Sequence, residues 1–138
     1  MNANLISQLG QATVTDAMPF AEIVGRLIAE GVEYYHVDYA SLQFRFYGTE
    51  GGVVAVPLLL GMPQRIGSSL DKTALRAAIL DSQQNGQKFK DFSRRAVEAG
   101  VVGYVAFLSG KRVAYFGRQG DQHVEWFPGA KPTLDLSN

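Results

Sequence analysis

An ungapped internal repeat constrains this chain more than any other feature. The segment from Phe20 to Pro57 aligns with a second segment that begins 69 residues later, at Phe89, and seven of the 38 aligned positions are identical. The identical pairs are Phe20/Phe89, Arg26/Arg95, Gly31/Gly100, Val32/Val101, Tyr35/Tyr104, Gly48/Gly117 and Gly51/Gly120. Gly31 and Gly100 each follow an apolar helical pattern, where the chain commonly needs a positive φ that glycine adopts easily. The repeat therefore predicts one half-fold used twice.

Each copy has the pattern of two helices followed by three short strands. Apolar residues recur at helical spacing after Phe20 and again after Phe89, and alternation typical of strands follows each helix. The expected strands are residues 32–39, 42–47 and 53–58, then 101–108, 112–116 and 122–127. We therefore predict an α+β fold, in which a duplicated helix–helix–three-strand unit forms an antiparallel sheet covered by helices.

The repeat also predicts the domain boundaries. We expect a single domain over residues 1–128, made of repeats at about 1–58 and 70–128 that are linked by 59–69. Residues 129–138 are expected to form a C-terminal tail, frayed beyond Pro132. The segment Val101 to Leu108 is apolar on both faces, which predicts a central strand covered on both sides.

Composition excludes several classes of protein. The chain has no cysteine, so disulfides, thiolate metal sites and cysteine nucleophiles are excluded. Its start lacks the basic and apolar pattern of a signal peptide, and its longest apolar run, Val53 to Leu60, is too short to cross a bilayer. We therefore expect a cytoplasmic protein without membrane contact. Three-stranded meanders leave unpaired edges, so we also expect a homo-oligomer, most simply a dimer.

Two histidine–carboxylate pairs are the main chemical candidates. His36 and Asp38 share one face of a predicted strand, as do His123 and Glu125. If the two strands were neighbours, the four side chains could bind zinc or iron, and either pair alone could act as a base with an orienting acid. Neither pair is repeated in the other copy, which favours solvated strand residues instead. We therefore expect no bound metal or cofactor.

Two further surfaces are candidates for binding. Tyr35, Tyr104, Tyr115 and Trp126 could line a small-molecule pocket between the copies, although Tyr35 and Tyr104 are simplest as core residues. A strand face with Gln43, Arg45, Tyr47 and, in the second copy, Arg112 could stack nucleobases. The formal net charge of zero makes a nucleic-acid partner unexpected.

The second copy resembles a known family of small proteins. It has F-x-x-F from Phe89, then A-x-x-A-G-V from Ala96, Tyr104, Tyr115, a Gly-Asp turn and Glu125 before Pro128. These features are similar to the prophage-associated proteins of the YdfO/YbcV type, often labelled phage envelope proteins. The resemblance implies an α+β fold and a bacterial or phage setting, with no activity or catalytic residues. The sequence thus favours a binding or protein-interaction module, with a small metal-dependent or acid–base hydrolase as the alternative.

Overall fold

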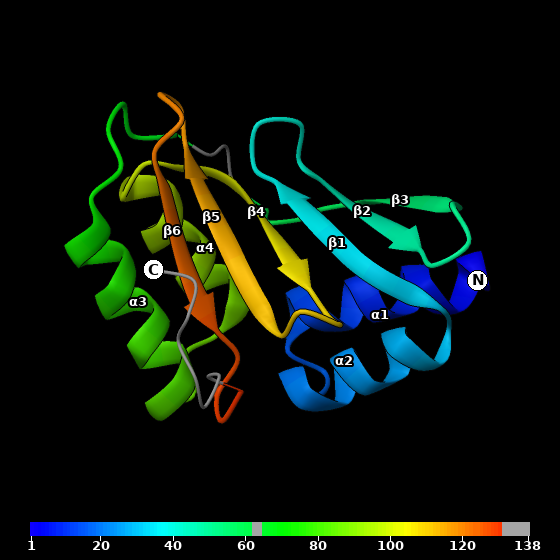
Figure 1. Ribbon diagram of the computed structural model, residues 1–138. Coiled ribbons are helices and arrows are strands. Elements are labelled where there is room, and N and C mark those ends of the chain that lie inside the picture. The colour runs from blue at the N-terminus through cyan, green and yellow to red at the C-terminus, as the bar shows by residue number, and fades with distance from the viewer. Residues whose placement is uncertain (62–64, 131–138) are drawn as a thin grey trace.

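The computed structural model describes residues 1–61 and 65–130, which form four helices and six strands in an α+β fold (Figure 1). The first half contains α1 (Ala3–Thr15), α2 (Phe20–Ala29), β1 (Val32–Asp38), β2 (Gln43–Gly48) and β3 (Val53–Pro57). The second half contains α3 (Lys72–Gln84), α4 (Phe89–Glu98), β4 (Val101–Phe107), β5 (Arg112–Gly117) and β6 (Gln122–Trp126). The expected tail beyond residue 130 lies outside the described residues.

The six strands form one antiparallel sheet in the order β3-β2-β1-β4-β5-β6. Strands β1 and β4 pair at its centre, so the two halves share a continuous sheet. The helices lie on one side of this sheet, with α1 and α2 under the first half and α3 and α4 under the second (Figure 1). The space between the two helix pairs is where the candidate site forms.

The two halves correspond residue by residue. Every element of the second half has the bounds of its counterpart plus 69, from α1 at Ala3 and α3 at Lys72 onward. Asn2 and Asp71 cap these two helices by accepting from backbone N–H groups in the first turn. In the central pair of strands, His36 of β1 lies opposite Val105 of β4, and Val105 is also the residue that matches His36 at the 69-residue offset. That register places the centre of the sheet at the join between the halves.

Strand alternation decides which residues form the core. Tyr35 and Val37 of β1 face the helices and are buried, whereas Tyr34 and His36 face the other way and are half-buried. Strand β4 is central, as its apolar sequence predicts. The prediction that both of its faces are covered is wrong, because the helices lie on one face and Phe107 is 36% exposed on the other.

The helices approach the sheet differently in the two halves. Helix α1 lies directly on β3, and Gly10 allows this, since a Cβ there would lie 3.2 Å from Val56 Cγ1. The counterpart of Gly10 at the 69-residue offset is Ile79 of α3, a buried bulky residue. Helix α3 packs mainly on α4. The second half thus lacks the close helix–sheet contact of the first.

A second exchange on the sheet adds to this difference. Phe44 of β2 is fully buried in the first half, and its counterpart in β5 is the smaller Val113. Ile79 and Val113 both line the open space between α3 and the sheet.

Candidate ligand-binding cavity

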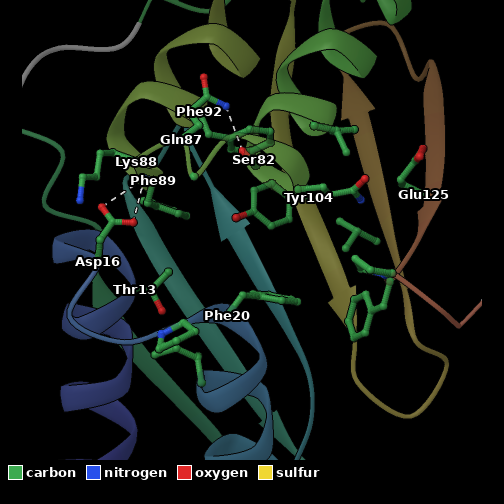
Figure 2. Close-up of a pocket in the computed structure, with 18 of the residues that line it drawn as sticks. Thr13, Asp16, Phe20, Ser82, Gln87, Lys88, Phe89, Phe92, Tyr104 and Glu125 are labelled. Carbon is green, nitrogen blue, oxygen red and sulfur yellow. Dashed lines mark hydrogen bonds between the residues drawn. The ribbon is translucent and has the colours of Figure 1, made fainter.

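A cavity of about 660 Å³ lies between the two helix pairs and the sheet (Figure 2). Its walls come from the turn between α1 and α2, the turn between α3 and α4, and strands β1, β4, β5 and β6. The lining residues are Thr13, Asp16, Ala17, Met18, Pro19, Phe20, Ile23, Tyr35, Ile79, Ser82, Gln83, Gly86, Gln87, Lys88, Phe89, Phe92, Tyr104, Val113, Tyr115, Glu125, Trp126, Phe127 and Pro128. Both halves of the chain therefore contribute to it.

Three tyrosines form the buried floor of the cavity. Tyr35, Tyr104 and Tyr115 project from β1, β4 and β5 toward the helices and are 3%, 6% and 6% exposed. The Tyr104 and Tyr115 rings lie 5.2 Å apart between centroids, and Phe92 of α4 contacts both rings. The structure thus places these three tyrosines, and Trp126, on the border of the cavity, while their role in binding a ligand stays a prediction.

The hydroxyls of these three tyrosines have no hydrogen-bond partner among the residues that the structure describes. Tyr39, the fourth buried tyrosine, donates to Ser93 Oγ at 2.9 Å. Within residues 1–61 and 65–130, the structure gives the hydroxyls of Tyr35, Tyr104 and Tyr115 no such partner. Figure 2 shows the Tyr104 hydroxyl pointing into the cavity.

Burial keeps the tyrosine hydroxyls of the cavity floor protonated. Desolvation raises the pKa of Tyr35, Tyr104 and Tyr115, and nearby tyrosine hydroxyls and Glu125 add to the effect at Tyr115. The hydroxyls therefore stay neutral at physiological pH. Each can donate one hydrogen bond and accept others.

The rim of the cavity joins the two halves. Asp16, which ends α1 in a left-handed conformation, accepts from the Phe89 backbone N–H with Oδ1 at 3.1 Å and Oδ2 at 3.2 Å. This carboxylate satisfies the first N–H of α4, where the helix dipole favours negative charge. The neighbouring Lys88 side chain points outward, away from Tyr104 (Figure 2). The carboxylate at the rim is therefore already hydrogen-bonded to the protein.

One histidine–carboxylate pair borders the cavity. His123 Nε2 and Glu125 Oε2 are 2.9 Å apart on the helix-facing side of β6, and Glu125 lines the cavity. The His123 ring lies beside the Tyr115 ring, with 6.4 Å between centroids. The predicted pairing of imidazole with carboxylate on this strand is thus present in the structure.

The other pair lies elsewhere. His36 and Asp38 are on β1, which is separated from β6 by β4 and β5, and they face the helix-free side of the sheet. The four candidate residues are therefore not brought together. Among residues 1–61 and 65–130, no three histidine, cysteine or acidic side chains cluster closely enough to hold a metal ion.

The helix-free face contains a polar cluster in the first half. Arg45 contacts His36 Nδ1, pairs with Asp38 Oδ2 at 3.3 Å, and donates to the Tyr47 hydroxyl at 3.1 Å. Two residues of the predicted nucleobase-stacking face, Arg45 and Tyr47, are therefore hydrogen-bonded to each other.

In the second half, the ring of Trp126 lies 4.0 Å from the Arg112 guanidinium. Because Arg112 and Trp126 are paired across β5 and β6, they lie on the same, helix-free face. Trp126 thus borders the cavity while its ring packs on Arg112, unlike the tyrosines of the floor.

Within the described residues, no helix has the length and apolar character needed to span a bilayer.

Comparison with known proteins identifies a family. The model of the family described as protein of unknown function (DUF1398) matches residues 10–125, which include the cavity floor and most of its walls. The chain belongs to this family. The DUF1398 match therefore covers both halves of the sheet together.

Curated relatives of this DUF1398 protein come from mycobacteria. Uncharacterized protein Mb2035 of Mycobacterium bovis and uncharacterized protein Rv2012 of Mycobacterium tuberculosis are each 31% identical over 90 residues. These matches cover 63% of this chain and 54% of each relative. The chain thus spans about half the length of the curated relatives that it matches.

Sequence reasoning missed most of the cavity wall. It used Phe20 and Phe89 only as repeat positions and did not single out Asp16 or Phe127, because each is compatible with an ordinary turn or core position. The available signal lay in the differences between the copies. The exchange of Gly10 for Ile79 and of Phe44 for Val113 opposes small to large on the helix and large to small on the sheet.

Proposed function

We propose that this DUF1398 protein is a non-enzymatic, cytoplasmic binding protein of prophage type that holds a small molecule in the cavity between its halves. One observation carries the proposal: three buried tyrosines line the cavity, and their hydroxyls have no partner within the described part of the chain. Each hydroxyl can donate one hydrogen bond. A ligand with an oxygen acceptor would supply a direct partner in place of solvent.

The size and lining of the cavity support this function. Small-molecule sites usually enclose about 300–1,000 Å³ and combine apolar walls with a few placed polar groups. The cavity of about 660 Å³ has mostly aromatic and aliphatic walls and polar groups on its floor and rim. We further propose that an internal duplication produced the two halves, supported by their matching bounds, and that divergence of the second half opened the site.

Filling the cavity tests the proposal. Nile red is a flat, uncharged dye whose fluorescence increases in apolar surroundings, and we expect saturable binding with one site per chain. Val113→Phe places a larger side chain in the cavity, so it should weaken Nile red binding at least tenfold. Val124→Phe, on the helix-free face of β6 where Val124 is 45% exposed, is the matched control and should bind as the parent does. Equal affinities for the parent and Val113→Phe would overturn the proposal.

The hydrogen-bonded His123–Glu125 pair favours a second candidate function. A carboxylate that orients an imidazole beside a cavity is an arrangement suited to general-base hydrolysis. Turnover of p-nitrophenyl acetate that is lost in His123→Gln and retained in His36→Gln would support this function. Identical rates in all three proteins would eliminate it.

We also propose that the protein forms a homodimer. Strands β3 and β6 are the two edges of the sheet, and large apolar side chains are exposed on its helix-free face at Val53, Phe107 and Val124. A second copy would cover this apolar surface.

A further inference from the structure

We infer that the ligand of the cavity is a flat, uncharged molecule that carries a hydrogen-bond-accepting oxygen, which the Tyr104 hydroxyl and its neighbours on the floor bind directly. This inference rests on the proposed binding function and specifies its ligand class. It follows from three features of the cavity: the arrangement of its aromatic rings, the tyrosine hydroxyls of its floor, and the hydrogen bonds that its carboxylates already accept within the protein.

The aromatic rings favour a flat ligand. Phe92 meets Tyr104 edge-on, at 81° between ring planes and 6.5 Å between centroids, and it lies 6.3 Å from Tyr115. On the opposite side, Phe20 meets Phe127 at 88° and 5.4 Å. Rings presented at such angles offer both faces and edges to a planar guest, which can stack on one ring and meet the edge of another.

The floor favours a ligand that accepts hydrogen bonds. Because burial keeps the three tyrosine hydroxyls protonated, each retains a proton to donate. The Tyr104 hydroxyl points into the space bounded by Asp16, Phe20 and Phe89 (Figure 2). A carbonyl oxygen of a guest in that space would accept from it, whereas a pure hydrocarbon would leave the donor unpaired.

The charged groups at the cavity favour a neutral ligand. Both oxygens of Asp16 accept from the Phe89 N–H, and Glu125 is bonded to His123, so this chain already supplies a partner to each carboxylate. Lys88 points away from the cavity (Figure 2). A buried ion needs a dedicated opposite charge. An anion would be repelled by the two carboxylates, and a cation would have to compete for them with the Phe89 N–H and with His123.

Four fluorescent probes of three fused rings test the ligand class, because they match in shape and differ in charge and in acceptor oxygen. N-methylacridone is neutral with a carbonyl, anthracene is neutral without one, anthracene-9-carboxylate is an anion and N-methylacridinium is a cation. We expect the intact protein to bind N-methylacridone at least tenfold more tightly than each of the other three.

Tyr104→Phe tests the role of the hydroxyl. It should weaken N-methylacridone about tenfold and leave the affinity for anthracene unchanged, since only the hydrogen bond is lost. Tyr34→Phe, on the helix-free face where Tyr34 stacks on Tyr47, is the control and should change neither affinity. Equal binding of N-methylacridone and anthracene, tighter binding of either ion, or no effect of Tyr104→Phe would overturn the ligand class while leaving the binding function standing. Failure of all four probes and of Nile red to bind would overturn the binding function itself.

Discussion

Buried tyrosines with the same surroundings differ in what their hydroxyls do. Tyr39 and Tyr104 are both buried, and their rings contact each other at 6.1 Å between centroids. The Tyr39 hydroxyl is bonded to Ser93, a buried serine, while the Tyr104 hydroxyl faces the cavity. The first hydroxyl therefore contributes to folding, and the second is available for recognition.

This difference predicts opposite consequences for one substitution at two positions. Tyr39→Phe removes a paired hydroxyl and leaves Ser93 without its partner, so it should lower the free energy of unfolding by about 1–3 kcal/mol. Tyr104→Phe removes a hydroxyl with no partner in the described chain and should change that free energy by less than about 0.5 kcal/mol. Urea denaturation of the ligand-free proteins measures both values, and equal losses would contradict the assignment.

His36 makes stability depend on pH. Burial lowers the pKa of His36, the Arg45 guanidinium lowers it further, and Asp38 opposes the change only in part. A histidine whose pKa is lower in the folded state stabilises the fold fully above its ordinary pKa of 6.5, and this contribution is lost as the pH falls through the lowered value. The parent should therefore lose stability between pH 7 and pH 5.

His36→Gln should flatten this dependence, as measured by urea unfolding at several pH values. Hydrogen bonds to Asp38 outweigh its burial and lower its pKa from 3.8, so any acid loss that it causes lies at lower pH than the range compared. A steep loss between pH 7 and pH 5 that persists in His36→Gln would refute the role of this histidine.

At the scale of elements, the helices explain why the cavity is in one half. Gly10 lets α1 approach β2 and β3 closely, whereas Ile79 at the matching position keeps its bulk between α3 and the sheet. The substitution Gly10→Ile transfers this bulk to the first half. It should destabilise the protein by about 1–3 kcal/mol, because the new side chain would overlap Val56 and Phe44.

Thermal or urea unfolding of Gly10→Ile provides the measurement. Gly25→Ile is the matched control, since a Cβ at that position of α2 meets nothing within 4 Å. A loss in Gly10→Ile no larger than in the control would show that close packing of α1 is not what distinguishes the halves.

The elements were largely predictable from the sequence, and their assembly was not. The bounds of β2 and β3 agree with the expected strands to within one residue, because local periodicity determines them. Which strands join the halves depends on pairing between residues far apart in the chain, such as His36 with Val105. Three of the four pocket candidates point to the cavity. The residues of its walls could not be predicted from the sequence, because they depend on how closely α1 and α3 approach the sheet.

At the scale of the whole molecule, one sheet connects the halves, and all helices of residues 1–61 and 65–130 lie on one of its faces. Val53 and Val124 are 54% and 45% exposed on the other face, one on each edge strand. Because each side chain is already about half enclosed, covering it would contribute roughly half of the ~1.5–3 kcal/mol that full burial provides. A second copy of the chain would supply that burial.

We expect light scattering to give the mass of a dimer. The double substitution Val53→Lys with Val124→Lys places charge on both edges and should convert the dimer to a monomer. Leu80→Lys is the control, since Leu80 is 50% exposed on α3 and lies away from this face. A monomeric parent, or a double variant that keeps the mass of a dimer, would refute the proposed association.

The contrast between Gly10 and Ile79 has a consequence for how this fold can vary. The tightly packed first half and the central β1–β4 pair stabilise the fold, while residues such as Val113 line open space and contribute less to stability. Substitutions in the wall of the cavity should therefore destabilise the protein less than substitutions under α1. Under the proposed binding function, the choice of ligand can therefore change at positions such as Val113 while the fold is kept.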